Sequence, residues 1–443
     1  MVTGAALVAR LAVIVWAAGR FPPAADGTYY HQLAERIATG QGYTWLWPDG
    51  AVTYAAHYPV GYPGMIAVVY AAFGAKPVLA MIVNALIGAA GAWAAYDVLA
   101  RSTSRGLAIA GGLVVALHPA LVPYTAALMT EGVTAAMWMV AAAFAGRARG
   151  VRGWRWLVGC GVVMGVATLV RPQTLLLAPV MGWLAGVGGT DAGAGAVKRA
   201  VVRAIMVTVV AIGICAPWTV RNCRRMERCA LVSVNGGWNL AIGSQTESGG
   251  WHEMVVPEEC REVFSEAGKD TCFGNAAKRV IAERPLAWLA RVPSKLRVTF
   301  DYFGAAPWYL NASNASSFPY GAKVVLGTIE TIASRLLLIA ALVAVRKLEG
   351  PRRLLREGVT AVGIVSCFMV AGTIGYLACG LAIMLLGTRE LARAPRIVPI
   401  TAAVITATAV MHAVFFGAGR YGLVVVPFVA VLAFVRARPL REA

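Results

Sequence analysis

The stretch PVLAMIVNALIGAAGAWAAYDVLA, residues 77–100, is 24 residues long and carries a single charged side chain. A bilayer has a hydrocarbon core of about 30 Å, which a helix of about 20 apolar residues can cross. Runs of this length or slightly less recur along the 443-residue chain, which is 59% hydrophobic and 14% charged. A water-soluble protein of ordinary composition is less apolar. The sequence therefore predicts an all-α, polytopic membrane protein.

The basic residues indicate which loops face the cytoplasm. The net charge is +19, but the basic side chains lie in short segments between apolar runs, which argues against nucleic-acid binding. This distribution is typical of cytoplasmic loops. The clusters are Arg101 and Arg105; Arg147, Arg149, Arg152 and Arg155; Lys198, Arg199 and Arg203; Arg346, Lys347, Arg352, Arg353 and Arg356; Arg389, Arg393 and Arg396; and Arg436, Arg438 and Arg441.

Placing these clusters inside predicts about twelve crossings. Arg10 lies in the middle of the first run, so we expect an uncleaved span rather than a signal peptide. Segment 61–76 is expected to lie at the outer interface. Segment 358–387 has basic clusters at both ends, which requires two short helices or a re-entrant pair. The other expected spans are 2–20, 77–100, 106–118, 126–146, 156–170, 173–188, 204–217, 322–345, 397–417 and 421–436.

Two polar segments are expected outside the cytoplasm. Segment 20–60 has two basic and three acidic residues, and segment 218–321 has twelve basic and ten acidic ones. The predicted parts are therefore an N-terminal transmembrane module, 1–217, with a first outer loop, 21–60; an extracytoplasmic cap, 218–321; and C-terminal transmembrane helices, 322–443. Four of the eight cysteines lie in the cap, where an oxidising compartment allows disulfides. Cys223 with Cys229 and Cys260 with Cys272 is one pairing among those left open.

Two acids interrupt the apolar pattern at the outer level. Asp26 begins a short amphipathic helix directly after the first run; it either caps that helix or acts as a general base. Glu131 stands where a span re-enters the membrane. An acid at a membrane edge is costly, which favours a functional role; the alternative is a surface residue that interacts with the helix dipole.

Three arginines lie at the outer ends of separate spans, where basic residues are unusual. Arg171, Arg221 and Arg420 are predicted to hold an anionic ligand, because the planar guanidinium matches phosphate oxygens. For Arg171 the alternative is a side chain that snorkels to the interface. Tyr30, His57 and Tyr421 are predicted to contribute to the substrate pocket. Aromatic residues also gather at membrane interfaces for purely structural reasons.

Several motifs together resemble a known superfamily. They are DGTYYHQLAERIATGQGYTW, AHYPVGYPGMIAVVYAAFG, LMTEGVTAAMW, LVRPQTLLLAPV, APWTVRN, VNGGWNLAIGSQTESGGW and HAVFFGAGRY, in this order. The chain resembles the GT-C glycosyltransferases, and among them the bacterial relatives of protein O-mannosyltransferases (glycosyltransferase family 39) and of lipid A aminoarabinose transferases. The resemblance extends over nearly the whole length. It implies a GT-C-like fold, a polyprenyl-phosphate sugar donor and inversion at the anomeric carbon. It also implies a lipid, polysaccharide or protein acceptor at the outer face of the inner (plasma) membrane.

The resemblance also suggests roles for individual residues. Asp26 matches the catalytic acid of the first outer loop, and Glu131 matches a second acid near the site. Arg171, Arg221 and Arg420 would contact the donor phosphate. Many relatives carry another acid where this chain has Gly27. A divalent metal held by Asp26 and Glu131 therefore stays an open possibility, and no other cofactor is expected.

A second class of function fits the same composition. A non-catalytic scaffold that binds lipid-linked sugars, or a flippase or transporter subunit, would also be polytopic. A transporter typically places polar residues near the bilayer midplane, in two repeated halves. Here the ionisable residues lie near the outer surface and no repeat is evident. Charge-neutral substitution of Asp26 separates these functions, because a scaffold does not need that carboxylate.

Overall fold

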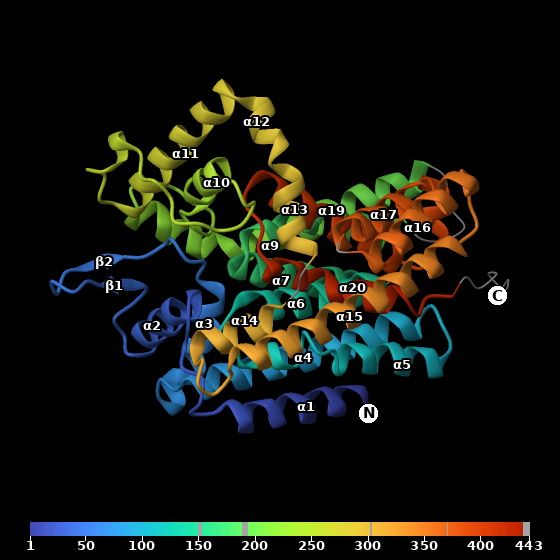
Figure 1. Ribbon diagram of the computed structural model, residues 1–443, viewed down its shortest axis with the longest axis horizontal. Helices are drawn as coiled ribbons and strands as arrows, with labels where there is room; N and C mark the ends of the chain where they lie inside the picture. Colours follow the sequence, from blue (N-terminus) through green and yellow to red (C-terminus); the bar gives the residue numbers. More distant parts are fainter. Residues whose placement is uncertain (149–152, 188–193, 302–303, 370, 437–443) are drawn as a thin grey trace.

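The computed structural model describes residues 1–148, 153–187, 194–301, 304–369 and 371–436. The molecule is almost wholly helical, and its long helices run side by side along one axis (Figure 1). Helix α1 (Val2–Ala17) leads toward the end of the bundle where the first outer loop and the cap lie. Of the predicted basic clusters, Arg149, Arg152, Arg438 and Arg441 lie outside the described residues.

Long apolar helices confirm the prediction of an all-α membrane protein. Within the described residues, five helices are long and apolar enough to cross a bilayer. They are α4 (Pro77–Ala100), α7 (Gly153–Val170), α9 (Ala194–Arg225), α15 (Tyr320–Arg346) and α19 (Ile397–Val414). Shorter helices include α3 (Gly61–Phe73), α5 (Arg105–Ala116), α16 (Arg353–Phe368) and α17 (Gly372–Met384). The total of about twelve crossings and the interfacial position of 61–76 stay predictions.

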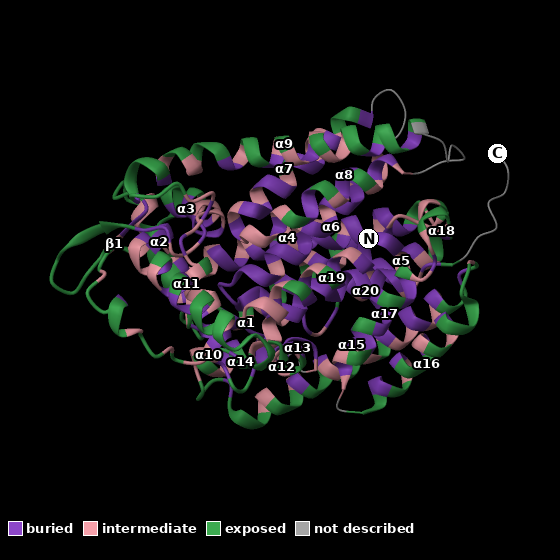
Figure 2. Cartoon of the chain, turned by 90° about the horizontal axis from the view of Figure 1, so that it is seen from above, coloured by how far each residue is buried: buried purple, intermediate pink, exposed green. Residues whose placement is uncertain are grey.

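Lipid-facing and protein-facing surfaces are distinct in the bundle. Figure 2 shows a long exposed face on α9, where Val202, Ile205 and Val209 are all exposed. The opposite face of α9 packs against α7 through glycines. A Cβ on Gly161 would lie 2.6 Å from Cβ of Val210. Such close approach of small residues is what holds helices together in lipid.

Two runs predicted as single spans have a different structure. Segment 173–188 forms the 3₁₀ helix η2 (Pro172–Leu177) followed by α8 (Ala178–Gly186), and segment 421–436 forms η4 (Gly419–Val425) followed by α20 (Val426–Leu432). At 1.5 Å per residue, α8 and α20 reach about 14 Å and 11 Å, well short of the hydrocarbon core. Prolines stand at the start of η2, of α8 and of α20, where a missing N–H is tolerated. Neither run is one straight spanning helix.

Two further boundaries refine the predicted topology. Helix α6 (Thr130–Arg147) begins four residues later than the run 126–146, after the 3₁₀ helix η1 (Pro123–Ala126). In contrast, segment 358–387 does form two short helices, α16 and α17, as expected. These helices pack against each other and against α15.

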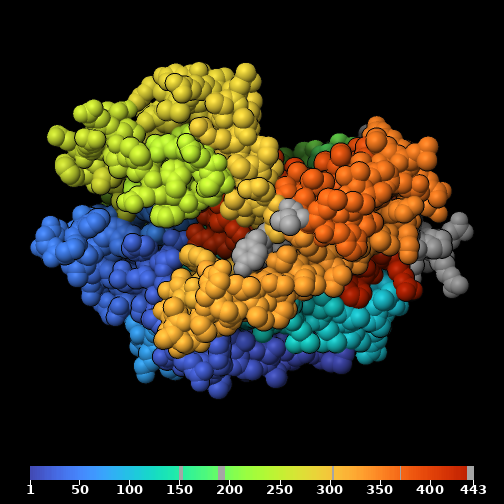
Figure 3. All heavy atoms as spheres, in the orientation of Figure 1, coloured from blue at the N-terminus to red at the C-terminus, as the bar shows by residue number. Residues whose placement is uncertain are grey.

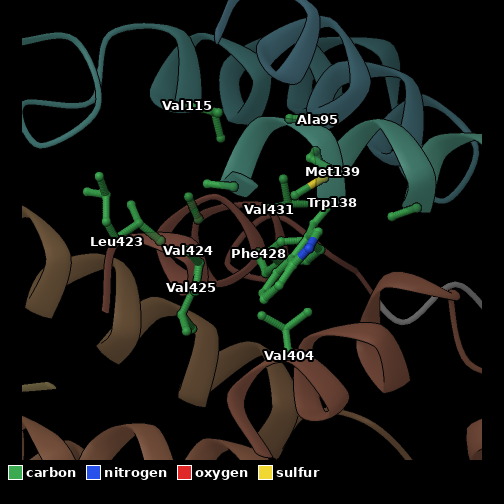
Figure 4. Close-up of a cluster of buried hydrophobic side chains, with 14 of the residues drawn as sticks. Ala95, Val115, Trp138, Met139, Val404, Leu423, Val424, Val425, Phe428 and Val431 are labelled. Atoms are coloured by element: carbon green, nitrogen blue, oxygen red, sulfur yellow. The ribbon is translucent and has the colours of Figure 1, made fainter. Parts of the chain in front are cut away.

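The segment that follows Arg420 lies at the centre of the bundle. Every residue from Tyr421 to Leu432 is buried. Figure 4 shows Phe428 and Val431 of this segment packed among Trp138 of α6 and Val404 of α19. A helix that is apolar on all sides is buried on all sides. Arg420, which directly precedes this segment, is therefore held in place by the protein core.

The first outer loop and the cap lie at one end of the bundle (Figure 1). The loop contains α2 (Asp26–Ala38) and a small antiparallel pair, β1 (Thr44–Leu46) and β2 (Val52–Tyr54). The cap contains α10 (Gly236–Gln245), η3 (Glu258–Cys260), α11 (Glu266–Glu283), α12 (Pro285–Ala290), α13 (Val292–Phe300) and α14 (Ala305–Ser313). Disulfides join Cys223 to Cys229 and Cys260 to Cys272, which is the pairing that the sequence analysis named.

Candidate active site

Asp26 is the first residue of α2 and does not cap it. The N-cap position is Ala25, and no side chain accepts a capping hydrogen bond there. Instead, Oδ2 of Asp26 lies 2.8 Å from Nη2 of Arg420, and Oδ1 accepts a long hydrogen bond of 3.4 Å from the Tyr58 hydroxyl. The Asp26 side chain keeps 31% of its surface exposed. A capping role for this carboxylate is therefore wrong.

Glu131 lies in the first turn of α6 and is buried, with 2% of its side chain exposed. Oε1 is 2.7 Å from Nη1 of Arg171 and 3.5 Å from Nε of Arg420. Oε2 accepts a hydrogen bond of 2.7 Å from the Tyr124 hydroxyl. Arg420 thus joins the two acids into one network. The alternative of a surface-facing glutamate is wrong.

The two arginines of this network differ in how fully their donors are used. Nη1 of Arg171 also donates to Oγ1 of Thr130 at 3.1 Å. With the Gln173 side-chain oxygen facing the guanidinium, Nε and Nη2 of Arg171 donate to it at 3.0 and 3.2 Å. Nη1 of Arg420 contacts the sulfur of Met129 at 3.8 Å, and a thioether is a weak acceptor. Arg420 is therefore better able than Arg171 to accept a new anionic partner.

Tyr421 and Tyr30 line this network, each in a different way. The ring of Tyr421 lies 5.1 Å from the guanidinium carbon of both Arg171 and Arg420, in the range of cation–π contacts. Tyr30 packs edge-on against Tyr58 at 5.3 Å. Burial raises the pKa of the Tyr30 hydroxyl well above its ordinary value, and the carboxylates of Asp26 and Glu131 raise it further. Tyr30 therefore stays neutral and cannot supply a negative charge here.

His57 lies in the aromatic wall beside the network. Its ring packs edge-on against Tyr58 at 5.0 Å and against Trp238 at 5.3 Å. Burial lowers the pKa of His57 below 6.5, partly opposed by the nearby carboxylates of Glu266 and Asp26. The imidazole is thus neutral near pH 7. It contributes a ring face and polar ring nitrogens to the wall, but no charge.

Arg221 is not brought to this network. Its Nη1 donates to the carbonyl of Ala55 at 2.7 Å, and Nη2 donates to the carbonyl of Tyr43 at 2.8 Å. The guanidinium also lies over the ring of Trp218 at 4.7 Å. These contacts fasten the first outer loop to the end of α9. Arg221 therefore anchors the first outer loop and does not belong to the network of Asp26 and Glu131.

The site does not fit a metal ion shared by Asp26 and Glu131. Within the described parts of the chain, no group of three or more His, Cys, Asp or Glu side chains could hold a metal. The guanidinium of Arg420 contacts both carboxylates and would repel a cation between them. A side chain at Gly27 has no room either, since its Cβ would lie 2.8 Å from the Tyr309 hydroxyl and 3.0 Å from the Leu128 carbonyl oxygen.

The sequence analysis missed two residues that organise the site. Tyr58 and Glu266 touch the network or its wall, yet neither interrupts an apolar span. Oε2 of Glu266 accepts hydrogen bonds from the backbone N–H groups of Ala56 at 2.6 Å and His57 at 3.0 Å, and Oε1 accepts from the indole of Trp45. Tyr58 adjoins His57 in the sequence, so proximity could have indicated it; for Glu266 the sequence holds no such signal.

A comparison with protein families now bears on this geometry. Residues 57–220 match the model of the family described as dolichyl-phosphate-mannose-protein mannosyltransferase. The chain resembles the GT-C glycosyltransferases. The matched segment includes His57, Glu131 and Arg171, whereas Asp26 and Arg420 lie outside it. No curated protein matches the chain in sequence.

Solved structures of two membrane proteins are similar over most of the chain. One is the oligosaccharyltransferase AglB from Archaeoglobus fulgidus in complex with an inhibitory peptide and a dolichol-phosphate, at 13% identity and a TM-score of 0.46, covering 98% of this chain and 49% of that one. The other is ArnT from Cupriavidus metallidurans bound to undecaprenyl phosphate, at 16% identity and a TM-score of 0.39, covering 96% and 75%. This chain spans about half the length of the AglB chain.

Proposed function

We propose that this protein is an integral membrane glycosyltransferase that moves a sugar from a polyprenyl-phosphate donor to an acceptor at the extracytoplasmic face. The observation that supports this best is the state of Asp26. It is a partly exposed carboxylate held by Arg420 and Tyr58, next to a cation with donor capacity to spare. The similarity of residues 57–220 to a mannosyltransferase family adds support. Such an arrangement suits a base beside a phosphate leaving group.

The proposed reaction is a single displacement. Asp26 takes the proton from an acceptor hydroxyl or amine through Oδ1, the oxygen that is not paired with Arg420. The acceptor atom then forms a bond to the anomeric carbon while the carbon–oxygen bond to the phosphate breaks, which inverts the configuration. The electron pair leaves with the polyprenyl phosphate, and Asp26 releases its proton to solvent. Arg420 meets the charge that develops on the phosphate.

Each remaining polar residue has a narrower proposed role. Glu131 holds Arg171 and Arg420 in place, since its carboxylate contacts both. Arg171 offsets the buried charge of Glu131 and presents less free donor capacity to the donor phosphate than Arg420. The ring of Tyr421 contacts both guanidinium groups and helps to hold them in place. We assign Arg221 to the anchoring of the first outer loop rather than to the phosphate.

Aromatic side chains beside Asp26 are suited to hold a sugar. The rings of Tyr29 and Tyr58 are stacked with centroids 5.2 Å apart, and Trp45 packs edge-on against Tyr29 at 5.9 Å. Tyr29 is 44% exposed, so part of this surface is open to a ligand. Aromatic rings combine an apolar face with a polar tip, which matches the two kinds of surface on a pyranose.

We place the site on the outer side of the inner (plasma) membrane. Asp26 follows α1 directly, and the cap beside it carries both disulfides, which form in oxidising compartments. Arg147, which belongs to a basic cluster, lies at the opposite end of α6 from Glu131.

The decisive experiment compares Asp26→Asn with Asp49→Asn. Purified protein in detergent is supplied with radiolabelled polyprenyl-phosphate sugars, and both sugar release and donor binding are measured. We expect Asp26→Asn to lose turnover by roughly 10²–10⁴-fold while donor binding persists. Asp49 belongs to the same outer loop but accepts a hydrogen bond from the Ala51 N–H in an exposed turn, so Asp49→Asn should match the wild type.

Two outcomes would overturn parts of this proposal. Equal turnover in the wild type and in Asp26→Asn would remove Asp26 as the base. Donor binding without turnover, across a broad panel of sugars and acceptors, would favour the non-catalytic scaffold.

A further inference from the structure

The arm formed by α11 and α12 stands off to one side of the helix bundle, with α12 at its far end (Figures 1 and 3). No residue of α12 is buried, and Leu286 and Leu289 are 78% and 52% exposed. Val280, near the end of α11, is 43% exposed. Exposed apolar surface costs about 25 cal/mol per Å² relative to burial. The tip of the arm is therefore an apolar surface without a partner in the described part of the chain.

The contacts of α13 indicate the level of this tip, that is, its position along the membrane normal. Only Arg291 separates α12 from α13. Nζ of Lys295, in α13, donates to the carbonyls of Ala413 and Val414 at 3.3 Å each, and these residues end the candidate span α19. The first half of α13 therefore lies at the outer end of a membrane helix.

The second half of α13 gives the same level independently. Asp301 accepts a hydrogen bond of 2.6 Å from the backbone N–H of Thr373, and the Thr373 hydroxyl donates to the Leu296 carbonyl at 3.2 Å. Thr373 lies in the first turn of α17, beyond the end of α16. At 1.5 Å per residue, α16 spans about 24 Å, so this connection lies near the outer edge of a hydrocarbon core of about 30 Å. Helix α12 adjoins α13 and lies at a similar level.

The charges around the tip match a layer of anionic headgroups. Lys278, Arg284 and Arg297 are exposed on α11, between α11 and α12, and on α13, against one exposed acid in the same stretch, Glu283. Arg279 is exposed as well but pairs with Glu259. Long basic side chains can place their charge among headgroups while their stems cover apolar surface. An apolar turn flanked by such residues is typical of helices that lie in the interface.

We infer that α12, together with the last turn of α11, is a membrane anchor that inserts Leu286 and Leu289 into the outer leaflet among anionic phospholipid headgroups. This anchor is independent of the proposed catalytic function. It would hold the cap against the bilayer. Because α13 contacts the end of α19 just before the segment that carries Arg420, the anchor also fixes one side of the site opening relative to the lipid.

A single spin label tests this inference on the full-length protein. The cysteines are either disulfide-bonded or buried, so Leu286→Cys offers one reactive thiol. The labelled protein is placed in nanodiscs containing an anionic phospholipid, and collisions of the label with oxygen, which concentrates in lipid, are compared with those of a water-soluble nickel complex. The matched control is Phe264→Cys, which is 82% exposed and precedes the other end of α11, about 27 Å away along the helix.

The expected result is that the label at position 286 meets oxygen several-fold more often than the nickel complex, whereas the label at position 264 shows the reverse. Equal preference for the nickel complex at both positions would overturn the anchor. A label at 286 that meets neither reagent would show that protein covers the tip, which also overturns it. Replacing the anionic lipid by a zwitterionic one should move position 286 toward water; no change would refute the role of the basic residues.

Discussion

The two ends of α6 carry the same ingredients in different arrangements. At the start, Glu131 lies between Arg171 and Arg420. At the other end, Arg147 pairs with Asp97 of α4 at 2.5 Å, and Asp97 also pairs with Arg101 at 3.2 Å. Each cluster is therefore one acid shared by two arginines. They are about 24 Å apart along the helix.

The two clusters differ in whether the charged side chains make all their contacts within the cluster. Both oxygens of Asp97 face guanidinium groups, and the guanidinium of Arg147 lies between Trp93 at 4.9 Å and Trp156 at 4.7 Å. That cluster is closed and stabilises the fold. At the other end, Arg420 extends the network to Asp26, a carboxylate that is partly exposed. A charge network becomes a candidate active site when one of its members stays exposed and can therefore contact a ligand.

The largest expected effect breaks each cluster at its shared acid. Glu131→Gln leaves Arg171 without its buried counter-charge, whereas Arg420 keeps Asp26. Removing one partner of a buried ion pair typically costs about 3–5 kcal/mol, and the change should abolish turnover because Arg420 loses the contact with Glu131 that helps to position it. Asp97→Asn should lower the melting temperature by less, since Arg147 and Arg101 are more exposed, and should leave turnover per folded molecule near the wild-type value. Thermal unfolding and sugar release from a labelled donor measure the two effects.

A loss of turnover in Asp97→Asn at an unchanged melting temperature would contradict this comparison, because it would give the closed cluster a functional role. The double variant Glu131→Gln with Arg171→Met separates the two roles of Glu131. It should recover part of the stability, because it removes the uncompensated charge of Arg171, but it should not recover turnover.

An intermediate effect is expected at Glu266, which connects the cap to the wall of the site. Glu266→Gln loses the charge that accepts the N–H groups of Ala56 and His57, and hydrogen bonds to charged groups are worth about 1.5–3 kcal/mol. The loop that carries Tyr58 should then loosen, so that amide hydrogen exchange at residues 56 and 57 speeds up and turnover falls roughly tenfold. Glu259→Gln is the matched control, because Glu259 pairs with Arg279 on the surface, where such pairs contribute little. Unchanged exchange in Glu266→Gln would refute this positioning role.

The sequence identified the charged residues of the network better than it identified their neighbours, since Asp26, Glu131, Arg171 and Arg420 do come together. Asp26 and Glu131 stand out as acids that interrupt the apolar pattern, which is costly at a membrane edge. Arg171 and Arg420 stand out because basic residues are unusual at the outer ends of spans. The same signal indicated Arg221, which the structure places elsewhere. Hydropathy locates a residue along the membrane normal, but it does not say at which side of the bundle the residue lies. The packing of the helices against one another decides on which side a residue lies, and this packing cannot be predicted from the sequence of a single span.

Two other features could not be predicted from the hydropathy pattern. The runs 173–188 and 421–436 were predicted as spans because they are apolar, yet the second is buried in protein rather than in lipid. Protein interior and hydrocarbon select the same residues, so hydropathy does not separate them. Glu266 was missed because two of its partners are backbone amides about 210 residues away in the chain, and an amide has no sequence signature.

The smallest expected effect is the pH dependence contributed by His57. Burial lowers the folded-state pKa of His57 below 6.5, so the unfolded chain binds this proton more readily than the folded protein does. Stability from His57 is therefore fully present above about pH 6.5 and falls as the pH drops toward the folded-state pKa, by at most about 1.4 kcal/mol per pH unit. His57→Gln should flatten the fall in melting temperature between about pH 6.5 and 5, whereas His252→Gln, in which the replaced Nδ1 contacts the neighbouring Glu253 carbonyl at 2.8 Å, should keep it. An equal fall in His57→Gln and in the wild type would mean that His57 stays as easily protonated in the fold as in the unfolded chain, and the aromatic wall beside Asp26 would then be open to water.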